Sequence, residues 1–439
     1  MRVLFCSTGI NALGESFSQA LFAKELIGHG HQCFFIAPKL AGEYLLTFDL
    51  KKETFLTLPN EKDLGINFDI NLNKDLFDKF LKEVKPDYII LADWHHFKSD
   101  GVANNNTYSL SWFDKNIPMG TFDHVGFAPQ GRTVFQDEIK RLLHKSTLGN
   151  FQVKNFLPVQ ERISFIIRPC PHHNNLISPD NNIYNWALFK DKYEKNGQPE
   201  NFFRKYNIKD AIIILNPIGM WQEHLIEHVF KRFNIKYNYY FDIFLPIIFN
   251  VLHKIPKNII YSVISVNVKK EEVETHKNIT LIKRPPLKHE LFMENLLASD
   301  IFITDNLISS NLGKAVFSNI LPVVFKSSVY LDNNSSLTST FPLNKFILDK
   351  ISVLIDNKIV FPFRSFPTGL QELEEMYIDN PFTDCFIEQE LFDEESNTQL
   401  FEKLCISKEY RNNIIKNQNN YIKNNEQLLS AEEILIKNN

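Results

Sequence analysis

The chain has 439 residues, of which 44% are hydrophobic, and its formal net charge of -4 comes from acidic and basic residues mixed along the sequence. This length predicts two or three domains with substantial cores, and the charge argues against a nucleic-acid partner, which would need a basic surface. The five cysteines are scattered without a C-x-x-C pair, which favours reduced thiols over disulfides or a zinc site. The first apolar run is too short for a signal peptide or membrane span, so we expect a cytoplasmic protein with no transmembrane segment.

The first part of the chain alternates short apolar runs with helical patterns. A strand, a helix and a second strand form one βαβ unit, which implies a right-handed crossover and a parallel sheet. The same alternation then returns twice, and we expect an N-terminal domain over residues 1–185. Its predicted elements are strands at 2–6, 32–37, 88–92 and 118–122, and helices at 17–27 and 74–84.

A second series of the same kind follows a polar stretch at residues 178–209, whose composition is typical of a connection between domains. We expect a C-terminal domain over 205–370 and, because the chain then becomes acidic and helical, a tail over 371–439 that packs back across both domains. The fold class is therefore α/β, with two Rossmann-like doubly wound parallel sheets and a C-terminal helical tail. The predicted elements are strands at 211–215, 259–266, 279–282, 301–304 and 321–325, and helices at 239–253, 291–298 and 309–318.

Ligands bind at the carboxyl ends of strands in open parallel sheets, so the loops after strands are candidate sites. The first such loop, at residues 7–16, has nearly the glycine spacing of a P-loop, but Glu15 stands where a lysine would meet a phosphate, which argues against an NTPase. Glu15 at a helix N-terminus is either a general base facing a cleft or a first-turn acid favoured by the helix dipole. The two interpretations have equal weight.

Histidines follow two other predicted strands. Asp93, His95 and His96 come after the strand at 88–92, and His124 follows the strand at 118–122. Any of these histidines is a candidate base or acceptor contact, although loop histidines bonded to the backbone are somewhat more common. Adjacent histidines tend to diverge, and with one carboxylate they make a poor metal site, so no metal is predicted.

Two loops of the C-terminal domain suggest a ligand. After the strand at 211–215, Gly219 allows a ligand to approach the backbone, and Trp221 either stacks on a base or sugar or packs between the domains. After the strand at 301–304, small polar residues open a helix, where hydroxyls, amides and free backbone N–H groups favour an anion. They are Ser309, Ser310, Asn311, Gly313 and Lys314, of which Lys314 adds a positive charge, although Ser and Asn are also ordinary N-caps.

The stretch from Ile279 to Phe325 has a strand, a Pro-containing loop at 283–287, a helix, a strand led by Ala-Ser-Asp and the small polar loop. This order resembles the donor-binding half of GT-B glycosyltransferases. Residues 26–31 are similar to the usual GT-B N-terminus, and Gly14-Glu15 resembles the pair that supplies the catalytic base in members such as the Kdo transferases. The sequence departs from the family at Lys314, where a Glu usually binds the ribose, and at Asn319, which with an extra residue replaces the Gly before Pro322.

The resemblance implies a metal-independent, base-assisted glycosyltransferase that uses no cofactor beyond its nucleotide-sugar donor. The acceptor, a small molecule, peptide or glycan, would bind the first domain. The predicted catalytic residues are Glu15, with His95, His124 and Asp93 behind it. The predicted donor contacts are Gly219, Trp221, Arg284, Ser309, Ser310, Asn311, Gly313 and Lys314. The alternatives are a sugar-nucleotide epimerase or hydrolase on the same fold and a noncatalytic GT-B-like binding protein, and the donor, acceptor, stereochemistry and oligomeric state are left open.

Overall fold

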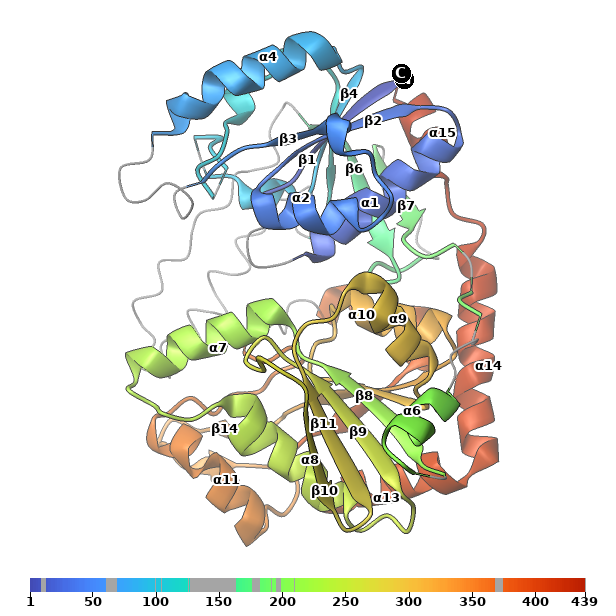
Figure 1. The fold of residues 1–439 in the computed structure, drawn as a ribbon. Helices are drawn as coiled ribbons and strands as arrows, with labels where there is room; N and C mark the ends of the chain where they lie inside the picture. The colour runs from blue at the N-terminus through green and yellow to red at the C-terminus, as the bar shows by residue number, and fades with distance from the viewer. Residues whose placement is uncertain are drawn as a thin grey trace.

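Two stacked α/β units make up the structure. The computed structural model describes residues 1–8, 13–60, 69–98, 100–103, 105–124, 126, 163–175, 182–190, 192–194, 199–208, 210–367 and 374–438. Each unit is built on a seven-stranded sheet, and Figure 1 shows the N-terminal unit above the C-terminal one. The expected α/β class, with two doubly wound domains and a helical C-terminal tail, is confirmed.

The N-terminal sheet is parallel throughout and has the strand order β3-β2-β1-β4-β5-β6-β7. Chain order reverses between β1 and β4, so the loops after these two strands lie side by side at the carboxyl edge. Its strands are β1 (Arg2–Cys6), β2 (Gln32–Ala37), β3 (Phe55–Thr57), β4 (Tyr88–Leu91), β5 (Met119–Phe122), β6 (Ile163–Cys170) and β7 (Ile183–Ala187). Its helices are α1 (Gly14–Gly28), α2 (Lys39–Leu46) and α4 (Lys74–Val84), with 3-10 turns at Lys52–Thr54, Ile70–Asn73, Trp94–His96 and Leu110–Trp112.

The C-terminal sheet has the order β10-β11-β9-β8-β12-β13-β16, and only the β10–β11 pair is antiparallel. Here the reversal falls between β8 and β12, which brings the loops after these strands together. The strands are β8 (Ile212–Pro217), β9 (Ile259–Ile264), β10 (Glu272–His276), β11 (Ile279–Arg284), β12 (Ile301–Thr304), β13 (Leu321–Lys326) and β16 (Ile387–Glu390), with a small hairpin of β14 (Tyr330–Leu331) and β15 (Leu337–Thr338). The helices are α6 (Pro199–Lys205), α7 (Met220–Arg232), α8 (Leu245–Leu252), α9 (His289–Leu297), α10 (Ser310–Phe317), α11 (Lys345–Asp356) and α12 (Glu374–Tyr377), with a π-helix at Tyr239–Phe244 and a 3-10 helix at Pro381–Cys385.

The polar connection expected at residues 178–209 contains a strand, so that expectation was wrong over part of its length. β7 pairs with β6 at the edge of the N-terminal sheet. Edge strands tolerate polar residues because they are bonded on one side only, and Asn185 lies in β7 beside the buried Trp186. The polar composition therefore hid a strand of the first domain.

The tail expected from residue 371 likewise contains a strand, β16, which pairs with β13 at the other sheet's edge. Its sequence, Ile-Glu-Gln-Glu, has no apolar run, and Glu388 is held there by ion pairs to Lys326 and Arg364. The helices α13 (Glu394–Ile406), α14 (Lys408–Asn425) and α15 (Ala431–Ile436) follow. Figure 1 shows α14 running beside the C-terminal unit and α15 against the N-terminal one, where Glu25 of α1 accepts a hydrogen bond from the Ala431 backbone at 2.7 Å.

The single amphipathic helix expected at 239–253 is instead the π-helix Tyr239–Phe244 followed by α8. Pro246 lies in the first turn of α8 and has no backbone N–H to continue the preceding ladder, which accounts for the change of helix type. The segment is buried on most sides rather than along one stripe. It belongs to the interior of the C-terminal unit.

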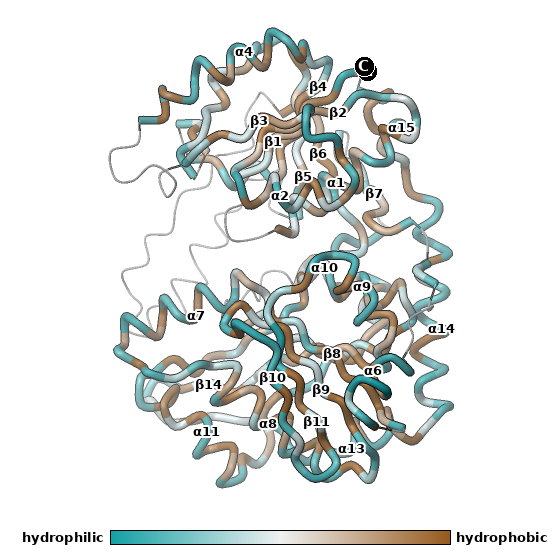
Figure 2. Tube along the Cα trace, in the orientation of Figure 1, coloured by the Kyte–Doolittle hydropathy of each residue, from teal (hydrophilic) through white to brown (hydrophobic). Residues whose placement is uncertain are grey.

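The apolar core follows the strands. In Figure 2 the central strands are mainly hydrophobic and β10 is hydrophilic, in agreement with the exposure of every β10 residue. One core cluster contains residues of both units, among them Phe17, Phe189 and Phe292. The two units therefore share an apolar contact at the edge where α9 and α10 face α1 (Figure 1). In the described part of the chain, none of the helices combines the length and the apolar character that crossing a membrane requires.

Candidate active site

Glu15 lies in the first turn of α1 beside a histidine of the β4 loop. Its Oε1 atom is 3.5 Å from Nε2 of His96, and Nδ1 of His96 is 2.8 Å from Oγ1 of Thr8. Oε2 of Glu15 is buried and has no hydrogen-bond partner within the described ranges. One carboxylate oxygen is thus oriented while the other is unpaired, an arrangement suited to taking a proton from a ligand.

Asp93 and His124 form a second pair at the same edge. Oδ2 of Asp93 accepts hydrogen bonds from the backbone N–H of His124 at 3.1 Å and from its Nδ1 at 3.2 Å. Nε2 of His124 is 2.8 Å from Oγ of the buried Ser18, which lies one turn after Glu15 on α1. Because Ser18 occupies Nε2, the His124 ring is less available to a ligand than Glu15 is.

The side chain of His95 lies outside the described residues, so its predicted role stays a prediction. Its neighbour His96 is the histidine that contacts Glu15. The sequence reasoning favoured His95 over His96 as a catalytic candidate, whereas the histidine that lies beside Glu15 is His96. In the part of the chain that the structure describes, no three His, Cys, Asp or Glu side chains group as metal ligands.

The helix α10 begins as the small polar residues predicted. Ser309 is its N-cap, and its Oγ accepts a hydrogen bond from the backbone N–H of Asn311 at 3.2 Å. Ser310 and Asn311 form the half-buried first turn. Gly313 faces Phe189, whose Cε2 would lie 2.4 Å from an added Cβ, so the structure shows a packing reason for this glycine.

Lys314 reaches back from α10 toward the start of its own helix, as helical side chains do. Its Nζ atom donates to Oδ1 of Asn311 at 3.2 Å and lies 4.2 Å from the ring centre of Phe17 and 5.3 Å from that of Phe292. The side chain is 3% exposed, and burial lowers the pKa of Lys314 to about 7. A single neutral acceptor is thus the only hydrogen-bond partner that the described residues give this ammonium.

Gly219 and Trp221 lie at the start of α7, directly after β8. Gly219 is the N-cap of α7, and a Cβ at this position would lie 2.5 Å from Oε1 of Gln222. Gln222 is buried and donates to Oδ1 of Asp305 at 3.1 Å. Trp221, the second residue of α7, is half-buried.

Asp305, which follows β12 directly, is a site residue that the sequence did not single out. Its carboxyl group accepts hydrogen bonds from Tyr240 at 3.1 and 3.2 Å and from Gln222. Burial, with a smaller contribution from the charge of Glu223, raises the pKa of Asp305 to about 7. Its place immediately after an apolar strand was the available signal, the same signal that singled out Asp93.

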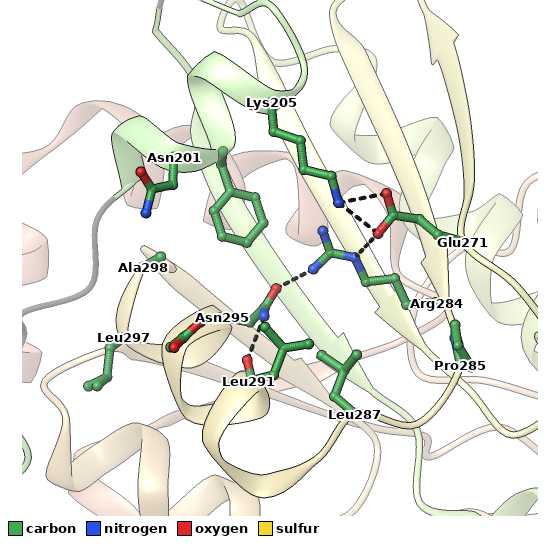
Figure 3. Close-up of a pocket in the computed structure, with 12 residues that line it drawn as sticks. Asn201, Lys205, Glu271, Arg284, Pro285, Leu287, Leu291, Asn295, Leu297 and Ala298 are labelled. Carbon is green, nitrogen blue, oxygen red and sulfur yellow. Dashed lines mark hydrogen bonds and ion pairs between the residues drawn. The ribbon is translucent and has the colours of Figure 1, made fainter.

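Arg284 is the last residue of β11, and its described partners are not among the residues at the start of α10. Figure 3 shows its guanidinium in a separate pocket, where it contacts Glu271 and Asn295. Its third partner is the hydroxyl of Tyr206. All three guanidinium nitrogens are therefore engaged within the protein, and the predicted donor contact by Arg284 stays a prediction.

The contact between Phe17 and Lys314 joins the Glu15 site of the N-terminal unit to the start of α10, because Phe17 lies two residues after Glu15 on α1. A second bridge is made by Tyr377, whose hydroxyl donates to the Leu307 carbonyl at 3.1 Å and is 3.4 Å from Nδ1 of His172. Leu307 lies in the loop that leads into α10, and His172 follows β6. The carboxyl edges of the two sheets thus face each other, with an acid–base pair on one side and a helix N-terminus with a lysine on the other.

Several solved structures share this architecture over the whole chain. Spinosyn forosaminyltransferase SpnP has a TM-score of 0.53 and 12% identity, with 100% of this chain and 98% of that one covered. MnaA of S. aureus, in a structure with UDP, has a TM-score of 0.51 and 13% identity at 99% and 95% coverage. The glycosyltransferase VinC, in complex with dTDP, has a TM-score of 0.51 and 10% identity at 100% and 98% coverage.

At such identities the likeness shows a shared fold, so the GT-B type of architecture is confirmed and the donor motif at residues 279–325 stays a prediction. A comparison with curated proteins found no match. A family model described as a family of unknown function matches residues 22–437, nearly the full chain. The chain belongs to this family, DUF6365.

Proposed function

We propose that the protein is a glycosyltransferase that moves a sugar from a nucleotide diphosphate-sugar to an acceptor hydroxyl. The C-terminal unit holds the donor and the N-terminal unit holds the acceptor. The observation that carries the proposal is the contact between Phe17 and Lys314, which places the Glu15–His96 pair and the first turn of α10 on the two sides of one interface. A base and an anion site opposite each other are what this reaction needs.

Residues of the N-terminal unit act on the acceptor, and residues of the C-terminal unit act on the leaving group. Glu15 takes the proton of the acceptor hydroxyl while that oxygen forms a bond to the anomeric carbon of the sugar. The bond from this carbon to the diphosphate oxygen breaks, and the nucleoside diphosphate leaves with the electron pair. The N–H groups at the start of α10, the Ser309 and Ser310 hydroxyls and Lys314 stabilise that negative charge in place of a metal ion.

Two neighbours support a nucleotide diphosphate as the ligand, since MnaA was solved with UDP and VinC with dTDP. Gly219 and Trp221 lie at the start of α7, directly after β8, the strand next to β12, and are the proposed contacts to the base or sugar. Lys314 stands where the related transferases usually carry a carboxylate for the ribose, so we propose no particular nucleobase for the donor.

A second candidate is an epimerase or hydrolase acting on the same kind of donor. Asp305 favours it, because a buried carboxyl group with a pKa of about 7 is suited to acid–base chemistry on the sugar itself. Glu223 lies near Asp305 and is also buried, and burial raises its pKa. In this case the donor would be consumed without an acceptor.

The test begins with binding. Thermal unfolding and calorimetry with a panel of nucleotides and nucleotide-sugars should give a stabilising ligand, and a complete absence of binding would sink both enzyme classes. Each ligand that binds is then incubated with and without candidate acceptors. Release of the nucleoside diphosphate that depends on an acceptor supports the transferase, conversion of the donor alone supports the epimerase or hydrolase, and binding without any conversion supports a noncatalytic binding protein.

Glu15→Gln should bind the donor normally and lose turnover by about 100-fold or more, because it removes only the proton acceptor. Glu290→Gln is the matched control. Glu290 is likewise the second residue of a helix at the interface edge, but it is exposed and in no described site contact. Equal activity of the two variants would remove Glu15 from the base role.

A further inference from the structure

Lys314 lies in an environment that disfavours its charged form. The residue is 3% exposed, its Nζ atom lies 4.2 Å from the ring centre of Phe17 and 5.3 Å from that of Phe292, and it donates to one neutral oxygen, that of Asn311. The two aromatic rings replace only part of the stabilisation that water would give the cation, and in the described ranges its one hydrogen-bond partner is an uncharged amide oxygen. The neutral amine form of Lys314 is therefore populated at a lower pH than it is in an exposed lysine.

An anion at the start of α10 would reverse this balance. Nζ of Lys314 already points to the first turn through its hydrogen bond to Asn311, so a phosphate bound at the start of α10 would lie next to it. A nearby opposite charge favours the charged form of a lysine. We infer that an anion bound at the N-terminus of α10 is taken up together with one proton, which Lys314 receives. This inference rests on the proposed donor site and concerns its regulation by pH.

Among the described residues, the titratable groups that pack near Lys314 have pKa values outside the range in which Lys314 titrates. Asp305 after β12, with a pKa of about 7, is a separate candidate that the Lys314 variant below distinguishes. From α9, His289 faces the same interface against Phe17 and Phe48, and burial lowers the pKa of His289 to about 4, helped by the charges of Lys314 and of Lys24 on α1. On its own helix, the Nζ atom of Lys314 bonds to Asn311. Burial alone lowers the pKa of Lys314 to about 7.

The sign of the effect follows from that value. Below pH 7 the free protein already carries the charge on Lys314, so binding takes up no proton there and the affinity does not change with pH through this group. Above pH 7 the free amine is mostly neutral and the complex is charged, so the affinity falls by up to about tenfold per pH unit. At pH 8 binding should take up nearly one proton.

Calorimetry measures the uptake directly. UDP and dTDP are titrated into the full chain at pH 6 and pH 8, each in two buffers that differ in ionisation enthalpy. At pH 8 the terminal phosphate of these probes is fully ionised, because its last pKa is about 6, so it contributes no proton change. At pH 8 we expect the uptake of close to one proton. Any proton change measured at pH 6 belongs to the probe.

Lys314→Met removes the titrating group and should abolish the uptake at pH 8, whereas the exposed Lys345→Met on α11 should keep it. His289→Gln should also keep it, which separates the lysine from the histidine. Binding without proton uptake in the wild type would overturn this inference and leave the donor site standing. A failure of both probes to bind would remove the donor site and the inference with it.

Discussion

The Nζ atom of Lys314 lies 4.2 Å from the centre of the Phe17 ring, across the contact between the C-terminal helix α10 and the N-terminal helix α1. Phe17 shares the start of α1 with Glu15, and Lys314 shares the start of α10 with Ser309 and Asn311. This cation–aromatic contact therefore lies between the proposed base and the proposed anion site. Any change at this contact should act on both stability and binding.

Lys314→Met should stabilise the free protein most strongly at low pH. The folded-state pKa of about 7 lies below the ordinary value of 10.5, so the unfolded chain binds more protons between these two values. The wild type therefore gains stability as the pH rises from 7 to 10.5, and below pH 7 it carries the full penalty of the buried charge. Urea unfolding at pH 6 and pH 9 measures the difference between variant and wild type. A difference that is equal at both pH values would contradict the buried-charge account.

His96→Ala should lower turnover without weakening donor binding, because His96 orients Oε1 of Glu15 and lies on the unit opposite α10. His96→Gln can still donate a hydrogen bond to Glu15 and should restore much of the loss. The control is the exposed His276→Ala at the far edge of the C-terminal sheet. Steady-state kinetics over a pH series separates the roles. A simply structural His96 would lower the melting temperature and leave the pH profile of the remaining activity unchanged.

Much of this fold could be predicted because buried parallel strands are short apolar runs. The strands at 2–6, 32–37, 88–92 and 301–304 were predicted within a residue of β1, β2, β4 and β12. β7 and β16 escaped because edge strands need not be apolar on both faces, as the sequence Ile-Glu-Gln-Glu of β16 shows. The position of a residue after a strand was sufficient to find Glu15 and Asp93, since such loops must lie at one edge.

Contacts between distant segments could not be predicted from the sequence. The choice of His96 as the partner of Glu15 depends on the direction of side chains in a 3-10 turn. The burial of Lys314 depends on Phe17, nearly 300 positions away in the chain, and a lysine after a polar loop gives no sign of it. Arg284 was predicted near the nucleotide because of its loop, but its partner Tyr206 comes from a segment that the sequence assigned to a connection.

Asp305→Asn should stabilise the protein increasingly as the pH rises through the acid range. Burial keeps the folded-state pKa of Asp305 at about 7, above the ordinary 3.8, so the native state retains a proton that the unfolded chain has lost. The wild type therefore loses stability between about pH 4 and pH 7, and the asparagine variant does not lose this part. Denaturant midpoints at pH 4.5, 6 and 8 give the trend. A wild-type advantage at pH 8 would indicate instead that the ionised carboxylate is needed by Gln222 and Tyr240.

Gly313→Ala tests whether that glycine serves packing or the ligand. Its Cβ would lie 2.4 Å from Cε2 of the buried Phe189, so the ring must move and we expect a loss of about 1–3 kcal/mol in the free energy of unfolding. Gly28→Ala at the end of α1 is the control, because nothing lies within 4 Å of its added Cβ and alanine favours a helix by up to about 1 kcal/mol.

Phe189→Leu should make the Gly313→Ala change less harmful, and a double-mutant cycle measures this coupling. Phe189 packs against both Phe17 and Phe317, so the leucine variant alone loses stability, and the informative quantity is the departure from additivity. A favourable coupling with unchanged UDP or dTDP affinity assigns Gly313 to the contact between the units. Additive stabilities with a weakened affinity would instead mean that the glycine lets a ligand approach the α10 backbone, as its position in the polar loop predicted.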